Sequence, residues 1–363
     1  MGDNHHVYRR IISSLRQIYP KQLTGRQARH MNTLAGMVSG IVRSGQSHLK
    51  AMAKKAPDQS KVESRIKRFS RYLQNEGIDA QTYFMPFVKA LLVGLANCGP
   101  LALAIDGIEV GRNCLALVVS VIYQKRALPL VWVVVRGSKG HFPEEMHCQL
   151  VQAVKPLLPE DSDVIFLGDG EFDGNQLQAE IDNNGWQYVC RTAKNRLIDD
   201  DGDQFALDEI QLQPGDCLPL PDVTVTQNKY GPVLVVAWWR KDAQEPIYLV
   251  SNMELAEEAC YWYGKRFRIE TFFSDQKSRG FHLQKSHISD PERMSRLLIA
   301  ACLAYIWVIY LGAIAKRDEW VTIIHRTDRC DLSLFQLGLD LLEHFLNESL
   351  PIPVAFQMPV SSH

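Results

Sequence analysis

The segment Leu101-Ala-Leu-Ala-Ile-Asp-Gly-Ile108 opens a series of three apolar runs that decides the fold of this chain. The other two runs, 115–123 and 127–135, follow after short polar interruptions and are rich in β-branched residues. Runs of this length and composition are typical of strands that are buried in a sheet. We therefore expect three sequential strands in this part of the chain.

Helical and strand patterns alternate after these strands. We expect a helix over 143–158, a strand over 163–168, a helix over 175–184 and a strand over 186–192. Three sequential strands followed by an alternation of helix and strand indicate an α/β fold with a mixed sheet.

Residues 194–250 interrupt that alternation. Three short apolar runs here, 223–226, 233–240 and 247–250, predict antiparallel strands inserted into the α/β layer. The acidic run 199–203 suggests a calcium-binding loop, but its sixth position is not glycine and no glutamate closes it. We therefore expect an exposed acidic turn.

The N-terminal residues 1–80 are strongly basic, with fifteen Lys or Arg against five Asp or Glu, although the whole chain has a net charge of −1. Such a segment either binds a polyanion or is a solvated basic surface, and we favour nucleic acid. Helices are expected from Thr24 through the 30s, over 47–57, and after a capping box formed by Ser60 and Glu63. This order resembles a helix-turn-helix unit. Its candidate DNA-binding residues are Lys61, Arg65, Lys67, Arg68 and Arg71.

The remaining composition is ordinary for a soluble globular protein of 363 residues, 46% of them hydrophobic. Its eight cysteines are widely scattered, which excludes a Cys-x-x-Cys zinc or redox pair. Together with an N-terminus that does not read as a signal peptide, this predicts a cytosolic protein.

Residues 297–315 form an apolar stretch that is near the length needed to cross a bilayer. A membrane anchor and a long helix buried in a large core both fit this pattern. We favour the buried helix, because this is the only such stretch and it comes late in the chain.

Four residues, Tyr263, Arg266, Glu270 and Lys277, form the most informative motif of the sequence. On one continuous helix, with about 100° of turn per residue, their side chains would lie along one stripe. A carboxylate flanked by two cations and a hydroxyl suits a site that holds a metal and binds phosphate. The alternative is a solvated helix face with ion pairs between neighbouring turns.

Two aspartates extend this motif. Asp106 ends the first expected strand and Asp169 ends the fourth. An acid at the end of an apolar strand is costly unless it lies at an exposed rim or binds a metal. With Glu270 as a third carboxylate, the set is suited to two hard divalent cations. Each aspartate taken alone fits a turn residue at a strand end.

With these residues the chain resembles the DDE transposases of bacterial insertion sequences, of the insertion-sequence-four type with a Tyr-Arg-Glu-Lys signature. Tyr263, Arg266, Glu270 and Lys277 match all four signature positions, and Asp106 and Asp169 match the two family aspartates. Ile108 and Phe267 depart from the usual residues at their positions, where a small hydroxyl residue and a tryptophan are frequent.

The resemblance implies a ribonuclease H-like core interrupted by a β-rich insertion, with helical N- and C-terminal regions. It divides the chain into a DNA-binding region (1–96), the first part of the core (97–193), the insertion (194–255), the second part of the core (256–320) and a C-terminal segment that could dimerise (321–363).

The resemblance also implies a mechanism. Asp106, Asp169 and Glu270 would hold two Mg²⁺ or Mn²⁺ ions that promote cleavage of a DNA strand and attack by the freed 3′-hydroxyl on target DNA. Tyr263, Arg266 and Lys277 would bind phosphates of double-stranded DNA. Stacking on an unpaired base is a possible role of Trp238 and Trp239, although a structural role as core and surface aromatics is the simpler interpretation.

The expected protein is a homodimer on paired element ends in the bacterial cytoplasm, associated with the nucleoid and not with a membrane. Three alternatives remain open: a catalytically silent DNA-binding relic or regulator, a stand-alone nuclease on the same fold, and a membrane-anchored protein.

Overall fold

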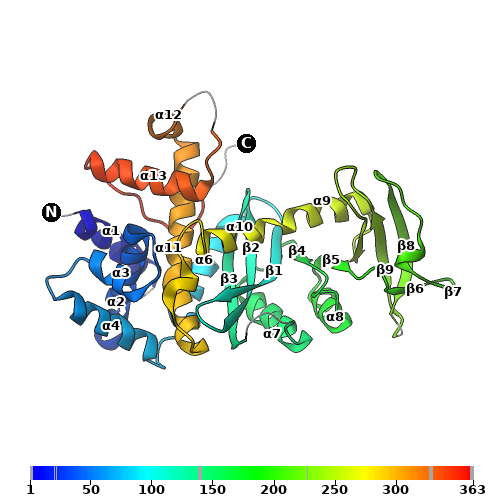
Figure 1. The fold of residues 1–363 in the computed structure, drawn as a ribbon, viewed down its shortest axis with the longest axis horizontal. Helices are drawn as coiled ribbons and strands as arrows, with labels where there is room; N and C mark the ends of the chain where they lie inside the picture. Colours follow the sequence, from blue (N-terminus) through cyan, green and yellow to red (C-terminus); the bar gives the residue numbers. More distant parts are fainter. Residues whose placement is uncertain are drawn as a thin grey trace.

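A computed structural model describes residues 3–19, 21, 23–137, 141–226, 228–326 and 330–359 of the protein. Figure 1 shows helices from both ends of the chain gathered on one side, a sheet in the middle and a group of antiparallel strands on the far side. Parts of the expected terminal segments, including 327–329 and 360–363, lie outside the described residues.

The N-terminal region is helical, as the sequence predicted. Thr24 is the N-cap of the second helix, at the expected place. The expected capping box is wrong, because Lys61 is the N-cap of α4 and makes no side-chain cap. The Ser60 N–H instead donates to Asp58 Oδ1 at 2.5 Å. The helices are α1 (Asp3–Gln17), α2 (Gly25–Ser44), α3 (Leu49–Lys55), α4 (Val62–Gln74), α5 (Ala80–Tyr83) and α6 (Met85–Ala96).

A single ten-stranded sheet forms the centre of the molecule, in the order β3-β2-β1-β4-β5-β10-β9-β8-β6-β7. The three apolar runs of the sequence form an antiparallel meander, β4 pairs parallel with β1, and β5 pairs parallel with β4. The expected mixed sheet is therefore confirmed. Its first five strands are β1 (Leu101–Val110), β2 (Cys114–Tyr123), β3 (Arg126–Arg136), β4 (Val164–Gly168) and β5 (Gln187–Thr192).

The first strand is longer than expected, and Asp106 lies within it. Strand β1 continues to Val110 because β2 pairs with it from Leu103 to Val110. Its parallel partner β4 reaches only as far as Ala104, so Asp106 lies just beyond the last residue paired with β4. The carboxylate is therefore at the edge of the parallel part of the sheet although the strand continues.

The inserted strands extend the same sheet. Strand β10 (Ile247–Ser251) pairs antiparallel with β5 and joins β8 (Cys217–Val225) and β9 (Tyr230–Trp238) to the core. A hairpin of β6 (Leu197–Asp200) and β7 (Asp203–Ala206) was not expected, and the acidic turn forms its exposed tip.

Helices cover the sheet on both faces. Figure 1 shows α7 (Glu144–Val154) and α8 (Asn175–Asn183) below the strands, and α9 (Ala256–Arg266) and α10 (Arg268–Gln276) above them. The short 3-10 turns are η1 (Lys155–Leu157), η2 (Leu207–Glu209) and η3 (Leu283–Ser286).

The long apolar helix α11 (Pro291–Arg317) packs against α2, β3 and α13 (Leu334–Asn347), while the short α12 (Val321–Ile324) precedes α13. Within the described residues α11 is the one helix long and apolar enough to cross a membrane, and 94% of its apolar window is buried inside the molecule. Two glycines let α11 and α13 cross closely. A Cβ at Gly338 would lie 1.9 Å from the Val308 carbonyl oxygen, and one at Gly312 would lie 1.9 Å from that of Leu334.

Candidate active site

The signature motif lies on two helices. Helix α9 ends at Arg266, and α10 starts at Arg268 after the single residue Phe267. The Glu270 N–H bonds to the Phe267 carbonyl three residues back, so the chain tightens at the junction. The expected single stripe is therefore wrong. Tyr263 and Arg266 are on α9, Glu270 is on α10, and Lys277 is the C-cap that leaves α10 with non-helical angles.

Three carboxylates meet at this junction. Because β1 and β4 are parallel neighbours, Asp106 on β1 and Asp169 just after β4 come to the same edge of the sheet. Glu270 reaches that edge from α10. The Asp106 side chain is 21% exposed and that of Glu270 59% exposed, so the cluster runs from a half-buried floor to the surface.

Arg266 lies between these carboxylates. Its Nη1 is 3.5 Å from Asp106 Oδ2 and 3.9 Å from Asp169 Oδ2, and its Nη2 is 3.7 Å from Glu270 Oε1. The side chain is only 7% exposed. The Phe267 ring covers the guanidinium at 4.4 Å, and the buried Tyr263 ring is 5.9 Å away.

Burial and like charge perturb Asp106. Burial, together with the neighbouring Asp169 charge, raises the pKa of Asp106 to about 6. A hydrogen bond from the Gly107 N–H at 2.7 Å and the Arg266 guanidinium oppose this rise. The site therefore concentrates negative charge that a cation relieves.

The donor set fits hard divalent cations, since all three side chains offer carboxylate oxygens. Among the described residues, however, no three acidic, histidine or cysteine side chains stand in a group that could hold a metal ion as they are. The arrangement in place is an ion-pair cluster around Arg266.

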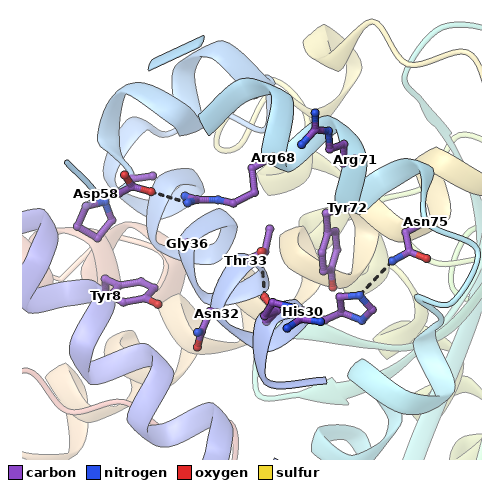
Figure 2. A pocket seen from close by; sticks show the side chains of 13 residues that line it. Tyr8, His30, Asn32, Thr33, Gly36, Asp58, Arg68, Arg71, Tyr72 and Asn75 are labelled. Carbon is purple, nitrogen blue, oxygen red and sulfur yellow. Dashed lines mark hydrogen bonds and ion pairs between the residues drawn. The ribbon is translucent and has the colours of Figure 1, made fainter. Parts of the chain in front are cut away.

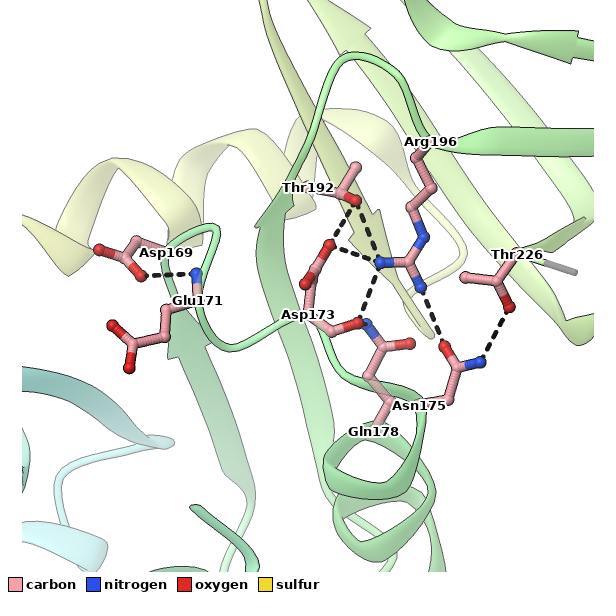
Figure 3. Close-up of polar contacts among 8 residues, drawn as sticks. All are labelled: Asp169, Glu171, Asp173, Asn175, Gln178, Thr192, Arg196 and Thr226. Carbon is pink, nitrogen blue, oxygen red and sulfur yellow. Dashed lines mark hydrogen bonds and ion pairs between the residues drawn. The ribbon is translucent and has the colours of Figure 1, made fainter. Parts of the chain in front are cut away.

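A polar network holds the loop that carries Asp169. Figure 3 shows the guanidinium of Arg196 among Asp173, Thr192 and Asn175. Arg196 Nη1 donates to Asp173 Oδ2 at 2.5 Å and to the Asp173 carbonyl oxygen at 3.0 Å, and its Nη2 donates to Asn175 Oδ1 at 2.9 Å. Asn175 in turn donates to Thr226 Oγ1 at 2.9 Å, so the network joins the loop after β4 to the inserted strands. Sequence reasoning missed it, because no local pattern signals a pairing 23 residues apart.

Glu171 stabilises the other side of the loop after β4. Its Oε1 accepts the Phe142 N–H at 2.5 Å, and its Oε2 lies 3.5 Å from His141 Nδ1. The buried His147 lies 3.9 Å from the carboxylate, and burial lowers the pKa of this histidine. Asp169 accepts the Glu171 N–H at 3.0 Å, so the position of Asp169 depends on this contact too.

The other two signature residues lie around the cluster. Tyr263 is 2% exposed, and burial raises the pKa of its hydroxyl against the effect of Arg266. Lys277 is half-buried, and burial lowers its pKa while Glu109 opposes the shift. Glu109, on β1, is thus the acid that acts on Lys277.

The basic residues chosen on α4 differ in their surroundings. Lys61, Lys67 and Arg71 are exposed. Arg65 donates to the carbonyl oxygens of Ala56 at 2.5 Å and Asp58 at 3.2 Å, and Arg68 pairs with the Asp58 carboxylate, so both hold the segment before α4.

The two candidate stacking tryptophans are both half-buried near the end of β9. Arg240 lies 5.9 Å from the Trp238 ring. Trp239 donates its Nε1–H to the Ala243 carbonyl oxygen at 3.1 Å, which gives it a structural role in the turn.

The mixed sheet brings three acidic side chains together, one from β1, one from the loop after β4 and one from α10. Residues 104–307 match the family model described as transposase DDE domain, which is more than half of the chain. The chain belongs to this family of DDE transposases, whose members in general act as nucleases and strand transferases.

Other comparisons add little. No curated protein sequence matches the chain. One similar solved structure is the cryo-EM structure of a piggyBac transposase synaptic complex with hairpin DNA, at 13% identity over 96% of this chain and 80% of that chain, with a TM-score of 0.45. Another is human ENDOV, at 13% identity over 59% of this chain and 94% of that chain, with a TM-score of 0.25. Since both TM-scores are low, the family assignment rests on the family model.

Proposed function

We propose that the protein is a transposase of the insertion-sequence-four type that binds the terminal inverted repeats of its element and catalyses metal-dependent strand cleavage and strand transfer. The observation that carries this proposal is the convergence of Asp106, Asp169 and Glu270 on Arg266, within the residues that match the family model. The core in this proposal is ribonuclease H-like.

The three carboxylates are the proposed ligands of two Mg²⁺ or Mn²⁺ ions. When bound, such ions lower the pKa of an attacking water or hydroxyl and offset the charge that develops on the phosphate. Asp106 and Asp169 contribute from the sheet edge, which is rigid because both strands are buried. Glu270 contributes from a more exposed position on α10.

Arg266 has two proposed roles. Without other cations it holds the carboxylates together by charge. Within the described part of the chain, its Nε and Nη1 atoms are buried and make no hydrogen bond. A guanidinium binds the oxygens of a phosphate in a fork, so in this proposal Arg266 exchanges its ion pairs with Asp106 and Asp169 for a DNA phosphate once metal ions occupy the carboxylates. Tyr263 and Lys277 are proposed to position the neighbouring phosphates.

The remaining assignments follow the same proposal. Region 1–96 binds double-stranded DNA through Lys61 and Lys67, with Arg65 and Arg68 fixing their segment. The insertion 194–255, which separates the core parts 97–193 and 256–320 in the sequence, carries Trp238 and Trp239, for which stacking on an unpaired base is the alternative to a structural role. Segment 321–363 contributes to a homodimer, since two element ends must be cut and joined together. The protein acts on the nucleoid in the bacterial cytoplasm.

Glu270→Ala tests this function. With Mg²⁺ and DNA that carries an element end, we expect the nicking rate to fall at least about a hundredfold. Removing a residue that only hydrogen-bonds to a metal ligand already lowers metal affinity or activity by about 10–100-fold, and Glu270 is proposed as a ligand itself. Binding of the same DNA should change little. Glu257→Ala, on α9 in the first turn and away from the cluster, is the matched control and should keep full activity.

Two outcomes would contradict the proposal. Nicking by Glu270→Ala at the wild-type rate would remove Glu270 from the reaction. Nicking by the wild type without any joined product would assign a nuclease in place of a strand transferase.

A further inference from the structure

A second concave site lies among the N-terminal helices, apart from the acidic cluster. A cavity of about 640 Å³ opens between α1, α2, α4 and the segment before α4 (Figure 2). This volume is within the range of about 300–1,000 Å³ that is typical of sites for small organic ligands. It is far larger than a phosphate ion needs.

The charge of this cavity is positive. Arg29, Arg68 and Arg71 line it, with Asp58 as the one acid among its lining residues. Arg68 pairs with Asp58. Although burial acts in the opposite direction, hydrogen bonds from Ser60 and Arg68 lower the pKa of Asp58 to about 2. This acid therefore stays ionised and paired with Arg68.

Two cations remain for a ligand. Arg29 and Arg71 are exposed, and neither forms an ion pair with an acid in the described ranges. They come from different helices, α2 and α4, and both line the same cavity. Arginines without acidic partners at one cavity are suited to a phosphate group.

The floor of the cavity is polar and fixed. His30 is held by the Tyr83 hydroxyl at 2.8 Å and by Asn75 Nδ2 at 3.0 Å. Tyr72 is 4% exposed, and its hydroxyl is buried without a hydrogen-bond partner among the described residues. Figure 2 shows Tyr8 and Tyr72 on opposite sides of the cavity. A ligand with a flat polar ring would pack against Tyr8 and supply a hydrogen-bond partner for the Tyr72 hydroxyl.

We propose that this cavity binds one unpaired nucleotide of a DNA strand, with its phosphate at Arg29 and Arg71 and its base against Tyr8 and the floor at Tyr72. The inference rests on the proposed function in that the N-terminal region is taken to contact DNA. Duplex DNA presents phosphates but keeps its bases stacked, so it does not fill a concave site. An unpaired nucleotide enters without the cost of unstacking, and its base stacks on an aromatic side chain.

Fluorescence anisotropy tests the proposal, with the full chain in EDTA so that no cleavage occurs. The probes are a blunt duplex and the same duplex with a short single-stranded tail. The wild type should bind the tailed probe more tightly. The double variant Arg29→Ala/Arg71→Ala should lose at least about tenfold in affinity for the tailed probe, since a hydrogen bond to a charged group is worth about tenfold or more. Its affinity for the blunt probe should fall less than about threefold, because the blunt duplex does not enter the cavity. Lys67→Ala, on α4 outside the cavity, should weaken both probes equally.

Thr33→Phe tests the cavity without changing charge. Thr33 lines the cavity, and its hydroxyl donates to the Arg29 carbonyl oxygen of its own helix, so the larger ring should fill the space. We expect this variant to lose the preference for the tail and to keep the affinity for the blunt duplex. Deoxyadenosine monophosphate should displace the tailed probe from the wild type and not from Thr33→Phe.

Three results would overturn the inference: an equal loss on both probes in the double variant, an unchanged preference for the tail in Thr33→Phe, or binding of the free nucleotide that tailed DNA cannot displace. A thermal melt of each variant confirms that it is folded. Because no step requires cleavage, an inactive but tail-binding protein would contradict the proposed transposase activity and leave this inference standing.

Discussion

The guanidinium of Arg266 lies 3.5 Å from the carboxylate of Asp106, so a buried cation and a half-buried acid from distant parts of the chain share one small volume. Asp169 and Glu270 border the same guanidinium. The charge of the cluster is therefore balanced only in part by Arg266, and its stability depends on which cation is present.

Arg266→Ala should lower the free energy of unfolding by about 1–3 kcal/mol in EDTA, because the neighbouring carboxylates lose their cation. Added Mg²⁺ should recover part of this loss, since a bound ligand stabilises the folded state by mass action. Urea denaturation with and without Mg²⁺ measures both effects. The control is Lys265→Ala. Lys265 is the neighbouring cation, but its ammonium stacks on Tyr261 and Trp262, so the stability of this variant should not depend on Mg²⁺. An unaltered stability in Arg266→Ala would show that the cluster does not need the guanidinium.

Arg196→Ala should loosen the loop that carries Asp169. The Arg196 side chain is 8% exposed and pairs with Asp173, so its loss should destabilise the fold by about 3 kcal/mol. Hydrogen exchange over residues 169–174 should rise, and nicking should fall while DNA affinity stays the same.

Arg191→Ala provides the control for this change. Arg191 forms an exposed pair with Glu245 at 3.9 Å, which should contribute no more than about 1 kcal/mol. If hydrogen exchange over residues 169–174 is unchanged in Arg196→Ala, the polar network does not influence the loop that carries Asp169.

The buried Asp275 gives stability a specific pH dependence. Burial raises its pKa to about 6, against the opposing effect of Arg126 at 3.4 Å. Because the folded pKa is above the value of 3.8 for the free side chain, the folded state binds the proton more tightly between about pH 4 and pH 6. The contribution of Asp275 to stability is therefore greatest below about pH 4 and is lost as the pH rises through 6.

Comparison with Asp275→Asn measures this effect. The stability of the wild type relative to Asp275→Asn should fall by about 1–3 kcal/mol between pH 4.5 and pH 7.5, since each pKa unit corresponds to about 1.4 kcal/mol. Urea melts at both pH values give the difference. Asp208→Asn, at an exposed acid, should show no such trend. A constant difference between wild type and Asp275→Asn would mean that Asp275 has an ordinary pKa.

Gly338→Ala should destabilise the crossing of α11 and α13 by about 3 kcal/mol, because its Cβ would meet the Val308 carbonyl oxygen at 1.9 Å and the backbones must separate. Gly94→Ala, in α6, meets nothing within 4 Å and should stabilise the protein by about 0.5–1 kcal/mol through helix propensity alone. Thermal unfolding compares the two. Equal changes in the unfolding temperature of both variants would show that α11 and α13 can move apart without loss of stability.

Much of the fold follows from local patterns. The three apolar runs from Leu101 to Val135 predict the meander of β1 to β3 because β-branched and apolar residues at this density have few other stable arrangements. The apolar stretch within α11 predicts a buried helix for the same reason. The acidic residues of the site were also found from the sequence, although their roles came from a resemblance to a family.

Other parts could not be read from local patterns. The capping box at Ser60 failed because Asp58 takes the Ser60 N–H. The helix at 263–277 was predicted as continuous, since nothing in its sequence signals the tighter turn at Phe267. The N-terminal cavity exists only because α1, α2 and α4 meet there.

The sequence by itself determined the order of strands and helices, the basic N-terminal region and the identity of the acidic residues, because these depend on hydrophobic period and residue type along a short stretch of chain. Only the tertiary structure decided that β10 joins the insertion to the core sheet, that Arg196 holds Asp173, and that Arg266 occupies the centre of the carboxylates. These contacts join residues far apart in the chain, and their energies depend on burial and distance that exist only once the sheet has formed.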